Sequence, residues 1–308
     1  MDSKNNEQSL PAQTREDSGK VLGRALTSVI SAGREILAKR RPFTASPKGS
    51  TDTLVALCRE ILHHRGEASG MALAQEITDA YRELPDAARL VFFQRLAADF
   101  DVDKEALLHA AKSYCEQPDY QHLQEVSHAV EAPRQKLFRR INMALDGTRT
   151  LVAMRGDLLR VLKANPELKP VDSDLKHLFI SWFNKGFLEL RSIDWSSPAV
   201  VLEKIIAYEA VHEINGWDDL RGRLSEDRRC FAFFHPAMGN DPLVFVEVAL
   251  TDSIPDAIAP LLDRSRDTIP AEQVSTVVFY SISNCHPGLS GISFGNFLIK
   301  NVVEELNK

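Results

Sequence analysis

Apolar residues in the first half of the chain recur every three or four positions. From about Thr53 to Phe187 this spacing is seen, for example, in Leu73, Ile77 and Tyr81. It is typical of helices that bury one face against their neighbours. No convincing strand pattern interrupts it, so this half predicts an all-α bundle of roughly six to eight helices.

The pattern changes after Leu188. Residues 195–220 still have helical spacing, and two short apolar runs follow at 230–235 and 242–250. The residues AMGND between these runs are typical of a hairpin loop because of their Gly and Asn. The runs therefore predict two antiparallel strands, and the β-branched run at 275–283 predicts a third.

Helices are expected at 254–263 and 295–306, with the sheet confined to the region after Cys230. The last helix carries an apolar stripe, which consists of Phe297, Leu298, Val302 and Leu306. Since no strand follows it before Lys308, the sheet looks unfinished, and the stripe is expected to be open and to favour self-association. The predicted fold class is α+β, an all-α helical bundle followed by a partial α/β domain.

The N-terminal residues have a different character. Residues 1–20 are polar and mixed in charge, which predicts disorder, and Pro, Gly and Ser at 40–52 predict a linker. The expected organisation is therefore a disordered tail and linker at 1–52, a helical domain at 53–188 and an α/β domain at 189–308.

Composition narrows the function classes. The 308 residues are 44% hydrophobic, and 37 basic against 43 acidic residues give a formal net charge of −6. A nucleic-acid partner is not expected, because phosphate neutralisation needs a basic face. The longest apolar runs, such as 243–250, are far shorter than the roughly 20 residues of a spanning helix, so no integral membrane protein is expected.

The cysteines and the N-terminal residues indicate the cellular compartment of the protein. Cys58, Cys115, Cys230 and Cys285 stand alone, without the close pairs of zinc or redox motifs. The polar start has no apolar core for secretion, and its acids are unlike a mitochondrial presequence. A cytoplasmic location is predicted, and no metal site is expected.

The segment FYSISNCHPGLSGISFGNFLIK carries the clearest chemical signal. It places a strand before a loop with Gly288, Gly291 and Gly295, and then a helix. Backbone amides in such a turn and at a helix start can bind a phosphate group. The spacing matches neither the P-loop nor the dinucleotide fingerprint, so the alternative remains that the glycines only make a turn.

Three consecutive blocks resemble the malonyl-CoA decarboxylase family. They are WDDLRGRL, CFAFFHPAMGNDPLVFVEVALT and FYSISNCHPGLSGISFGNFLIKNVVEEL, and LCREILHHRGEASGMALAQEITDAY resembles the family's helical amino-terminal domain. The resemblance implies an enzyme that converts malonyl-CoA to acetyl-CoA and carbon dioxide without a metal or organic cofactor. It further implies a helical domain that forms homo-oligomers and a second domain related to the GNAT acyltransferases.

The reaction makes a definite physical demand. Loss of carbon dioxide from a malonyl thioester leaves an enolate, which needs preorganised hydrogen-bond donors and then a proton. The family's catalytic serine matches Ser283, with Ser281 on the same face of the strand, and Ser283 is expected where two strands splay. The family's catalytic histidine lies in a block beyond Lys308, so the resemblance implies a chain that is incomplete at its C-terminus and turns over substrate poorly.

Two segments are candidates for the coenzyme A site. The first, implied by the resemblance, consists of Pro255, Asp256, Ala257, Ile258, Ala259, Pro260 and Leu261. The second, favoured by the anion-binding chemistry, consists of Asn284, Gly288, Gly291 and Gly295. Two basic groups are further candidates for a phosphate of the adenine ribose, although charge runs are usually solvated faces. They are the cluster KLFRRIN at 136–142 and the four arginines Arg221, Arg223, Arg228 and Arg229.

Other polar residues are assigned to the fold. His212, His235 and His286 lack a visible orienting partner and are interpreted as packing or loop histidines. Cys285 lacks a group that would lower the pKa of its thiol. Glu247, inside the strand pattern, either lines a site or faces solvent.

Two other functions remain open from the sequence. One is an acyltransferase that uses coenzyme A, and the other is a non-catalytic protein that binds coenzyme A or acts as a scaffold.

Overall fold

The structure is a computed structural model that describes residues 12–40, 50–263, 265–294 and 297–307. It divides into two compact units, Met1–Leu151 and Val152–Lys308. This division differs from the predicted boundary at 188/189. The reason is visible in the second unit, where the loop after the last strand packs on residues 152–156.

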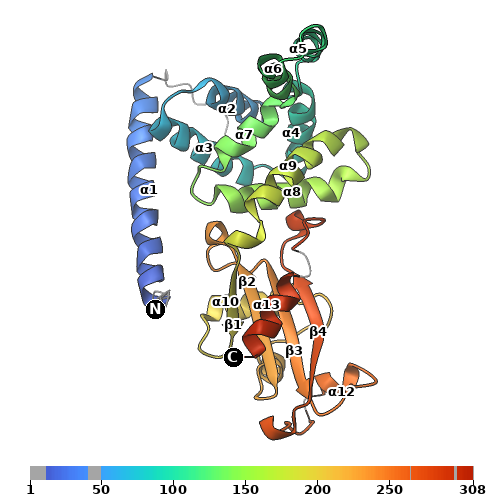
Figure 1. Ribbon diagram of the computed structural model, residues 1–308. Coiled ribbons are helices and arrows are strands. Elements are labelled where there is room, and N and C mark those ends of the chain that lie inside the picture. The colour runs from blue at the N-terminus through green and yellow to red at the C-terminus, as the bar shows by residue number, and fades with distance from the viewer. Residues whose placement is uncertain (1–11, 41–49, 264, 295–296, 308) are drawn as a thin grey trace, which may run out of the picture. The chain divides into compact units, whose positions relative to one another are not determined.

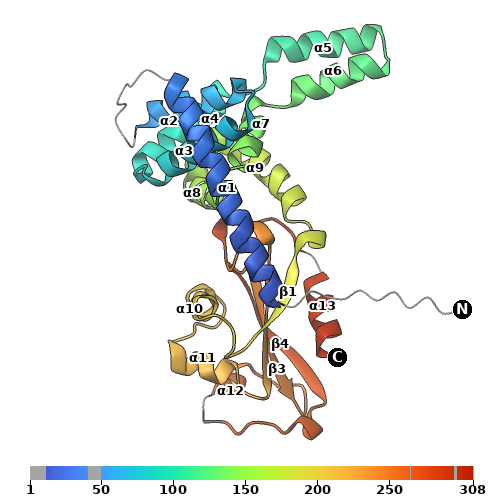
Figure 2. The same ribbon diagram turned by 90° about the vertical axis from the view of Figure 1, so that its left-hand side faces the viewer.

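The first unit is helical, as the apolar spacing predicts. Its helices are α1 (Ala12–Arg40), α2 (Thr51–His63), α3 (Glu67–Arg82), α4 (Asp86–Asp99), α5 (Lys104–Glu116), α6 (Tyr120–Val130), α7 (Pro133–Ile141) and the start of α8 (Gly147–Leu162) (Figure 1). Phe92 and Phe93 of α4 are buried and lie against the ring of Tyr81 on α3. Helices α5 and α6 lie side by side (Figure 2).

Helix α1 corrects the prediction of a disordered tail and linker over 1–52. Residues Ala12–Arg40 form one helix, which packs against α3, and Ile30 and Leu37 are buried. A Cβ atom at Gly33 would lie 2.1 Å from the Ala68 carbonyl oxygen, so only glycine allows this close approach. Residues 1–11 and most of the predicted linker, 41–49, lie outside the described residues.

The second unit combines helices with one antiparallel sheet. Its strands are β1 (Glu189–Ile193), β2 (Arg228–Phe234), β3 (Val244–Thr251) and β4 (Thr276–Asn284), in the order β1-β2-β3-β4. Its helices, besides the rest of α8, are α9 (Lys169–Trp182), α10 (Ala199–Tyr208), α11 (Trp217–Arg223), α12 (Ala259–Leu262) and α13 (Phe297–Leu306). Short 3-10 helices lie at Pro166–Leu168, Lys185–Phe187, Pro236–Met238, Ala271–Gln273 and Pro287–Leu289.

The predicted α+β class and the three antiparallel strands after Cys230 are confirmed, and three details are corrected. The sheet is not confined to the region after Cys230, since β1 pairs with β2 through Glu189–Ile193. The helix expected over 195–220 is two helices, separated by Glu209–Gly216. The helix expected at 254–263 covers only Ala259–Leu262.

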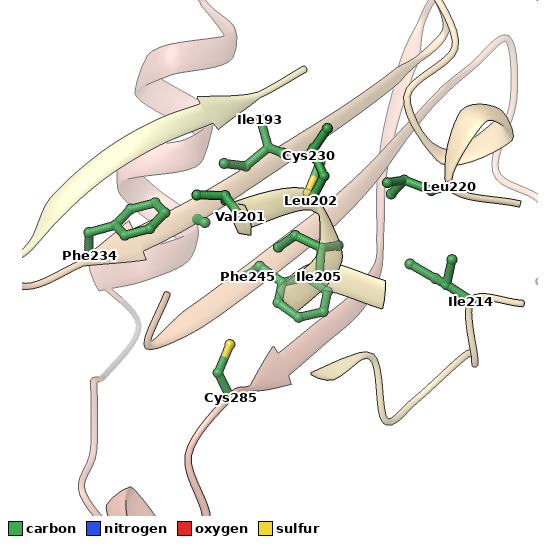
Figure 3. Close-up of a cluster of buried hydrophobic side chains, with 11 residues drawn as sticks. Ile193, Val201, Leu202, Ile205, Ile214, Leu220, Cys230, Phe234, Phe245 and Cys285 are labelled. Atoms are coloured by element: carbon green, nitrogen blue, oxygen red, sulfur yellow. The ribbon is translucent and has the colours of Figure 1, made fainter. Parts of the chain in front are cut away.

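Cross-strand register assigns side chains to the two faces of the sheet. Cys230 pairs with Glu247, Glu247 with Ser281, and Phe245 with Ser283, so these side chains share one face. Helix α10 covers this face, and its apolar side chains pack with residues such as Phe234 and Phe245 of the sheet (Figure 3). A buried polar row therefore runs across a face that is otherwise an apolar core.

Helix α13 covers the opposite face of the sheet from α10 (Figure 2). Leu298 and Val302 are buried, with exposed fractions of 6% and 0%, and Leu306 is half-buried. The expectation of an open stripe on this helix is therefore wrong for these residues. The side chain of Phe297 lies outside the described residues.

Candidate active site

Ser281 and Ser283 lie near the end of β4 on the face that α10 covers. Their exposed fractions are 2% and 1%, and their hydroxyl oxygens are 3.3 Å apart. The expected splaying of strands at Ser283 is not seen, since β3 and β4 remain paired as far as Val244 and Asn284. The ladder is irregular instead between Glu247 and Val248, opposite Tyr280.

Glu209 is the principal partner of both serines. The Ser281 hydroxyl lies 2.9 Å from each carboxylate oxygen of Glu209, and the Ser283 hydroxyl donates to Oε2 at 3.0 Å. The amides of Val211 and His212 also donate to Oε1, at 2.8 and 2.7 Å. The carboxylate, which is 7% exposed, thus gathers four different donors at one buried point.

Sequence reasoning missed Glu209 because its surroundings have helical spacing. The helix ends at Tyr208, and the side chain of Glu209 binds the amides of the next residues in place of helical carbonyl groups. The available signal was an acid that ends the apolar run IIAY in a predicted buried helix. Such a carboxylate needs partners when it is buried.

A second buried acid, Glu247, lies on the same face of the sheet, directly opposite Ser281. Glu247 is 0% exposed; its Oε2 accepts from Arg223 Nη1 at 2.9 Å, while its Oε1 has no hydrogen-bond partner among the described residues. Burial raises the pKa of Glu247 to about 8, with a further contribution from the charge of Glu209, while Arg223 opposes the shift. The structure thus resolves the open question from the sequence: Glu247 faces the interior.

The glycine loop after β4 is held by helix α8. A Cβ at Gly288 would lie 1.8 Å from the Val152 carbonyl oxygen, and buried Arg155 donates to the carbonyl groups of Gly288 and Ser290. The amides of Leu289, Ser290 and Ile292 make local turn bonds, so they are not directed at an anion. The remaining residues of this candidate segment lie apart from these bonds. Gly291 has φ +72°, and Asn284 is exposed and pairs with Val244. Gly295 lies outside the described residues.

The other proposed coenzyme A segment, 255–261, lies at the far end of the β3–β4 pair. It follows Thr251, six residues along β3 from the partner of Ser283, which is roughly 20 Å. Most of the segment is exposed, and Leu261 lines a pocket of about 150 Å³ together with Arg223 and Arg266. The structure therefore does not bring the two proposed segments together.

The candidate arginines are engaged with protein groups. Arg223 pairs with Glu247, Arg228 donates to the Leu261 carbonyl oxygen, and Arg221 stacks on Trp195. Arg229 donates to the carbonyl oxygens of Glu226 and Arg228. These contacts hold the segments around β2 in place, so the charges of these arginines serve the fold.

The remaining candidates have contacts that suit packing. His235 Nε2 contacts the Trp182 carbonyl oxygen at 3.1 Å, and burial lowers the pKa of its imidazole. The ring of His286 lies against Tyr208, and the ring of His212 lies against Tyr280. Burial raises the pKa of the Cys285 thiol, which disfavours its thiolate.

Neither a metal site nor a membrane-spanning helix is found among the described residues. No set of three His, Cys, Asp or Glu side chains converges within 12–40, 50–263, 265–294 and 297–307 in a way that could hold a metal ion. Within these ranges no helix combines the length and the apolar character needed to cross a bilayer.

The fold and the site define a class of protein: a helical unit followed by an α+β unit with a buried cluster of two serines and a carboxylate on one face of its sheet. Two family models match the chain, the malonyl-CoA decarboxylase N-terminal domain over residues 100–183 and the C-terminal domain over residues 186–308. Together they include β4 and the serines. The chain belongs to the malonyl-CoA decarboxylase family.

Individual relatives agree with this assignment. The mitochondrial malonyl-CoA decarboxylase of Anser anser anser is 42% identical over 178 residues, which are 56% of this chain and 35% of the relative. That of Rattus norvegicus is 39% identical over 178 residues, which are 56% of this chain and 36% of the relative. The chain thus spans about a third of the length of these curated relatives.

Solved structures give the same result. The crystal structure of malonyl-CoA decarboxylase from Rhodopseudomonas palustris has a TM-score of 0.80 and 51% identity, and the match covers 83% of this chain and 62% of that one. The structure from Agrobacterium vitis has a TM-score of 0.79 and 54% identity, with coverage of 82% and 62%. The two family models divide between residues 183 and 186, whereas the compact units divide after Leu151.

Proposed function

We propose that this chain acts on malonyl-CoA and releases carbon dioxide and acetyl-CoA, with Ser283 as a catalytic residue. The observation that supports it best is the buried Ser281–Ser283–Glu209 cluster, which lies within the match to the family's C-terminal domain. Buried polar groups need hydrogen-bond partners, and the partners found here hold two hydroxyl groups in one orientation, as a catalytic serine requires.

The reaction as proposed needs no metal or organic cofactor, since the thioester carbonyl itself accepts the electron pair that carbon dioxide leaves behind. The resulting enolate oxygen requires stabilisation, and the methylene carbon then requires a proton. Coenzyme A enters as part of the substrate. Homo-oligomerisation through the helical domain, a cytoplasmic location and the absence of a nucleic-acid or membrane partner stay predictions of the sequence.

The test is carbon dioxide release from malonyl-CoA by the 308-residue chain, with acetyl-CoA measured in parallel. Ser283→Ala is expected to lower kcat by roughly 100-fold or more and Ser281→Ala by less, because only Ser283 is proposed to meet the reacting group. Ser290→Ala, an exposed hydroxyl change in the following loop, is the matched control. Dialysis against a chelator is expected to leave the rate unchanged.

Three results would contradict the proposal. An unchanged rate for Ser283→Ala would remove that residue from the reaction. Transfer of the acyl group to an amine would favour the acyltransferase alternative. Binding of malonyl-CoA without any turnover would favour the non-catalytic alternative.

A further inference from the structure

Glu209 is a buried carboxylate whose hydrogen-bond donors among the described residues carry no charge. Its donors are the Ser281 and Ser283 hydroxyls and the amides of Val211 and His212, all of which are neutral. No Lys, Arg or His side chain forms an ion pair with it in the part of the chain that the structure describes. A carboxylate that is compensated in this way depends on its hydroxyl partners, which must direct their only proton toward it.

The hydroxyl protons decide what Ser283 can do. Each serine has one proton, and the geometry assigns both protons to the Glu209 oxygens at 2.9–3.0 Å. The Ala210 amide approaches Ser283 Oγ from the other side at 3.5 Å and occupies one acceptor position. Ser283 is therefore left with a lone pair, and not a proton, for any further contact.

We propose that Glu209 is the positioning residue of this site: its carboxylate accepts the hydroxyl protons of Ser281 and Ser283 and so fixes the position of Ser283 Oγ, whose remaining lone pair faces the group that supplies the proton of the reaction. This inference rests on the proposed function for its reaction, but not for its geometry. It also requires that the stabilising donors for the enolate oxygen come from groups other than the two serines.

The carboxylate itself is held in place. Two of its hydrogen bonds come from backbone amides just after it in the sequence, so the end of α10 and the carboxylate are fixed as one piece. Among the described residues, Glu247 on β3, Cys230 on β2 and Cys285 after β4 are titratable groups whose pKa the charge of Glu209 raises. Of these, Glu247 is the other carboxylic acid, and the negative charge of Glu209 contributes to its raised pKa.

The first experiment needs no turnover. In a Ser283→Cys variant, the ultraviolet absorbance of the introduced thiolate is measured against pH, with the wild-type chain subtracted to remove its own cysteines. An ionised carboxylate at 3.0 Å disfavours a thiolate, so adding Glu209→Gln is expected to lower the pKa of the introduced thiol by about one unit or more. Glu213→Gln, an exposed acid in the same segment, is the control and is expected to leave it unchanged.

Ser281→Cys, read in the same way, covers the case in which Ser283→Cys fails to fold. The proposal would be overturned if Glu209→Gln changed the pKa of the introduced thiol neither at position 281 nor at position 283. This holds whatever reaction the chain catalyses. A response at one or both positions supports an ionised Glu209 in contact with the serines.

The second experiment uses carbon dioxide release and a double-mutant cycle. Glu209→Gln is expected to lower kcat by roughly 10- to 100-fold with little change in KM, the size expected for a lost hydrogen bond to a charged group. In a Ser283→Ala background the same change is expected to cost little more, because Glu209 acts through Ser283. Glu209→Asp, which keeps the charge, is expected to retain part of the rate.

The outcomes separate the two proposals. Costs of Glu209→Gln and Ser283→Ala that simply multiply would show that Glu209 is structural and would overturn the inference. A wild-type chain that releases no carbon dioxide would remove the proposed function, while the introduced thiol would still decide whether Glu209 holds the serines.

Discussion

The two ends of the β3–β4 pair compensate a buried acid in different ways. At the serine end, Glu209 is surrounded by hydroxyl and amide donors. At the other end, Asp227 before β2 is paired with Arg266 and lies 3.5 Å from Arg228. Removing an acid held by arginines leaves their buried charges unpaired, whereas removing an acid held by serines releases the direction of their hydroxyl groups.

Glu247 lies between these two ends, and it is paired with an arginine through only one of its two carboxylate oxygens. One of its oxygens contacts Arg223, and the other has no hydrogen-bond partner among the described residues. Its pKa of about 8 is raised, whereas that of Asp227 is lowered. Burial alone would raise the pKa of Asp227 as well, but the hydrogen bond from Arg266 and the charge of Arg228 outweigh it. The number of arginines at each acid therefore decides whether the pKa of that acid is raised or lowered.

The largest expected effect is that of Asp227→Ala. It leaves Arg228 and Arg266 near a buried position without their acid, which is expected to cost roughly 3–5 kcal/mol in the free energy of unfolding. Denaturant unfolding at neutral pH measures it. Asp267→Ala, which removes an exposed acid next to Arg266, is the control; equal losses for the two variants would contradict the comparison.

The next effect concerns pH and Glu247. A folded-state pKa of about 8 against an ordinary value of 4.5 means that the folded chain retains a proton that the unfolded chain releases. Stability from this group is thus fully present below pH ~4.5 and is lost as pH rises toward 8. Between pH 5 and pH 7 the expected loss is roughly 2–3 kcal/mol.

Glu247→Gln has no proton to release and is expected to flatten this part of the pH profile of the unfolding free energy. The profiles of the two proteins are measured side by side by denaturant titration at several pH values. Parallel profiles for wild type and Glu247→Gln would show that the arginine pairing dominates at Glu247, as it does at Asp227.

The smallest effect tests the loop beside the serines. Gly288→Ala places a Cβ 1.8 Å from the Val152 carbonyl oxygen, so the loop must shift from α8 at an expected cost of about 2 kcal/mol. Thermal unfolding measures this cost, with the exposed Ser290→Ala as control. A stability close to wild type together with weakened binding of malonyl-CoA would restore the anion-binding interpretation of this glycine.

Much of the fold follows from local patterns, and the exceptions have physical reasons. The strands β3 and β4 have strong alternation or β-branched content, and the sequence predicts them within one or two residues. Strand β1 was missed because ELRSI is mixed in polarity, with only Ile193 buried. A strand that is largely exposed gives little periodic signal.

The sequence predicts the two serines of the site but not their carboxylate partner. Ser281 and Ser283 stand in a motif that resembles a known family, and their shared face follows from strand alternation. Glu209, by contrast, reaches them across 72 and 74 residues of sequence. Local propensity favours continuation of the helix there, and only tertiary hydrogen bonds end it.

The hydrogen bonds that Glu209 accepts from the Val211 and His212 amides also provide a built-in reporter. These two amides lie outside any helix or strand, yet a buried carboxylate protects them. Their hydrogen–deuterium exchange rates therefore follow the release of this carboxylate rather than the unfolding of the sheet. Slow exchange at these two positions in an otherwise fast-exchanging segment is the signature of a site whose serines are still held.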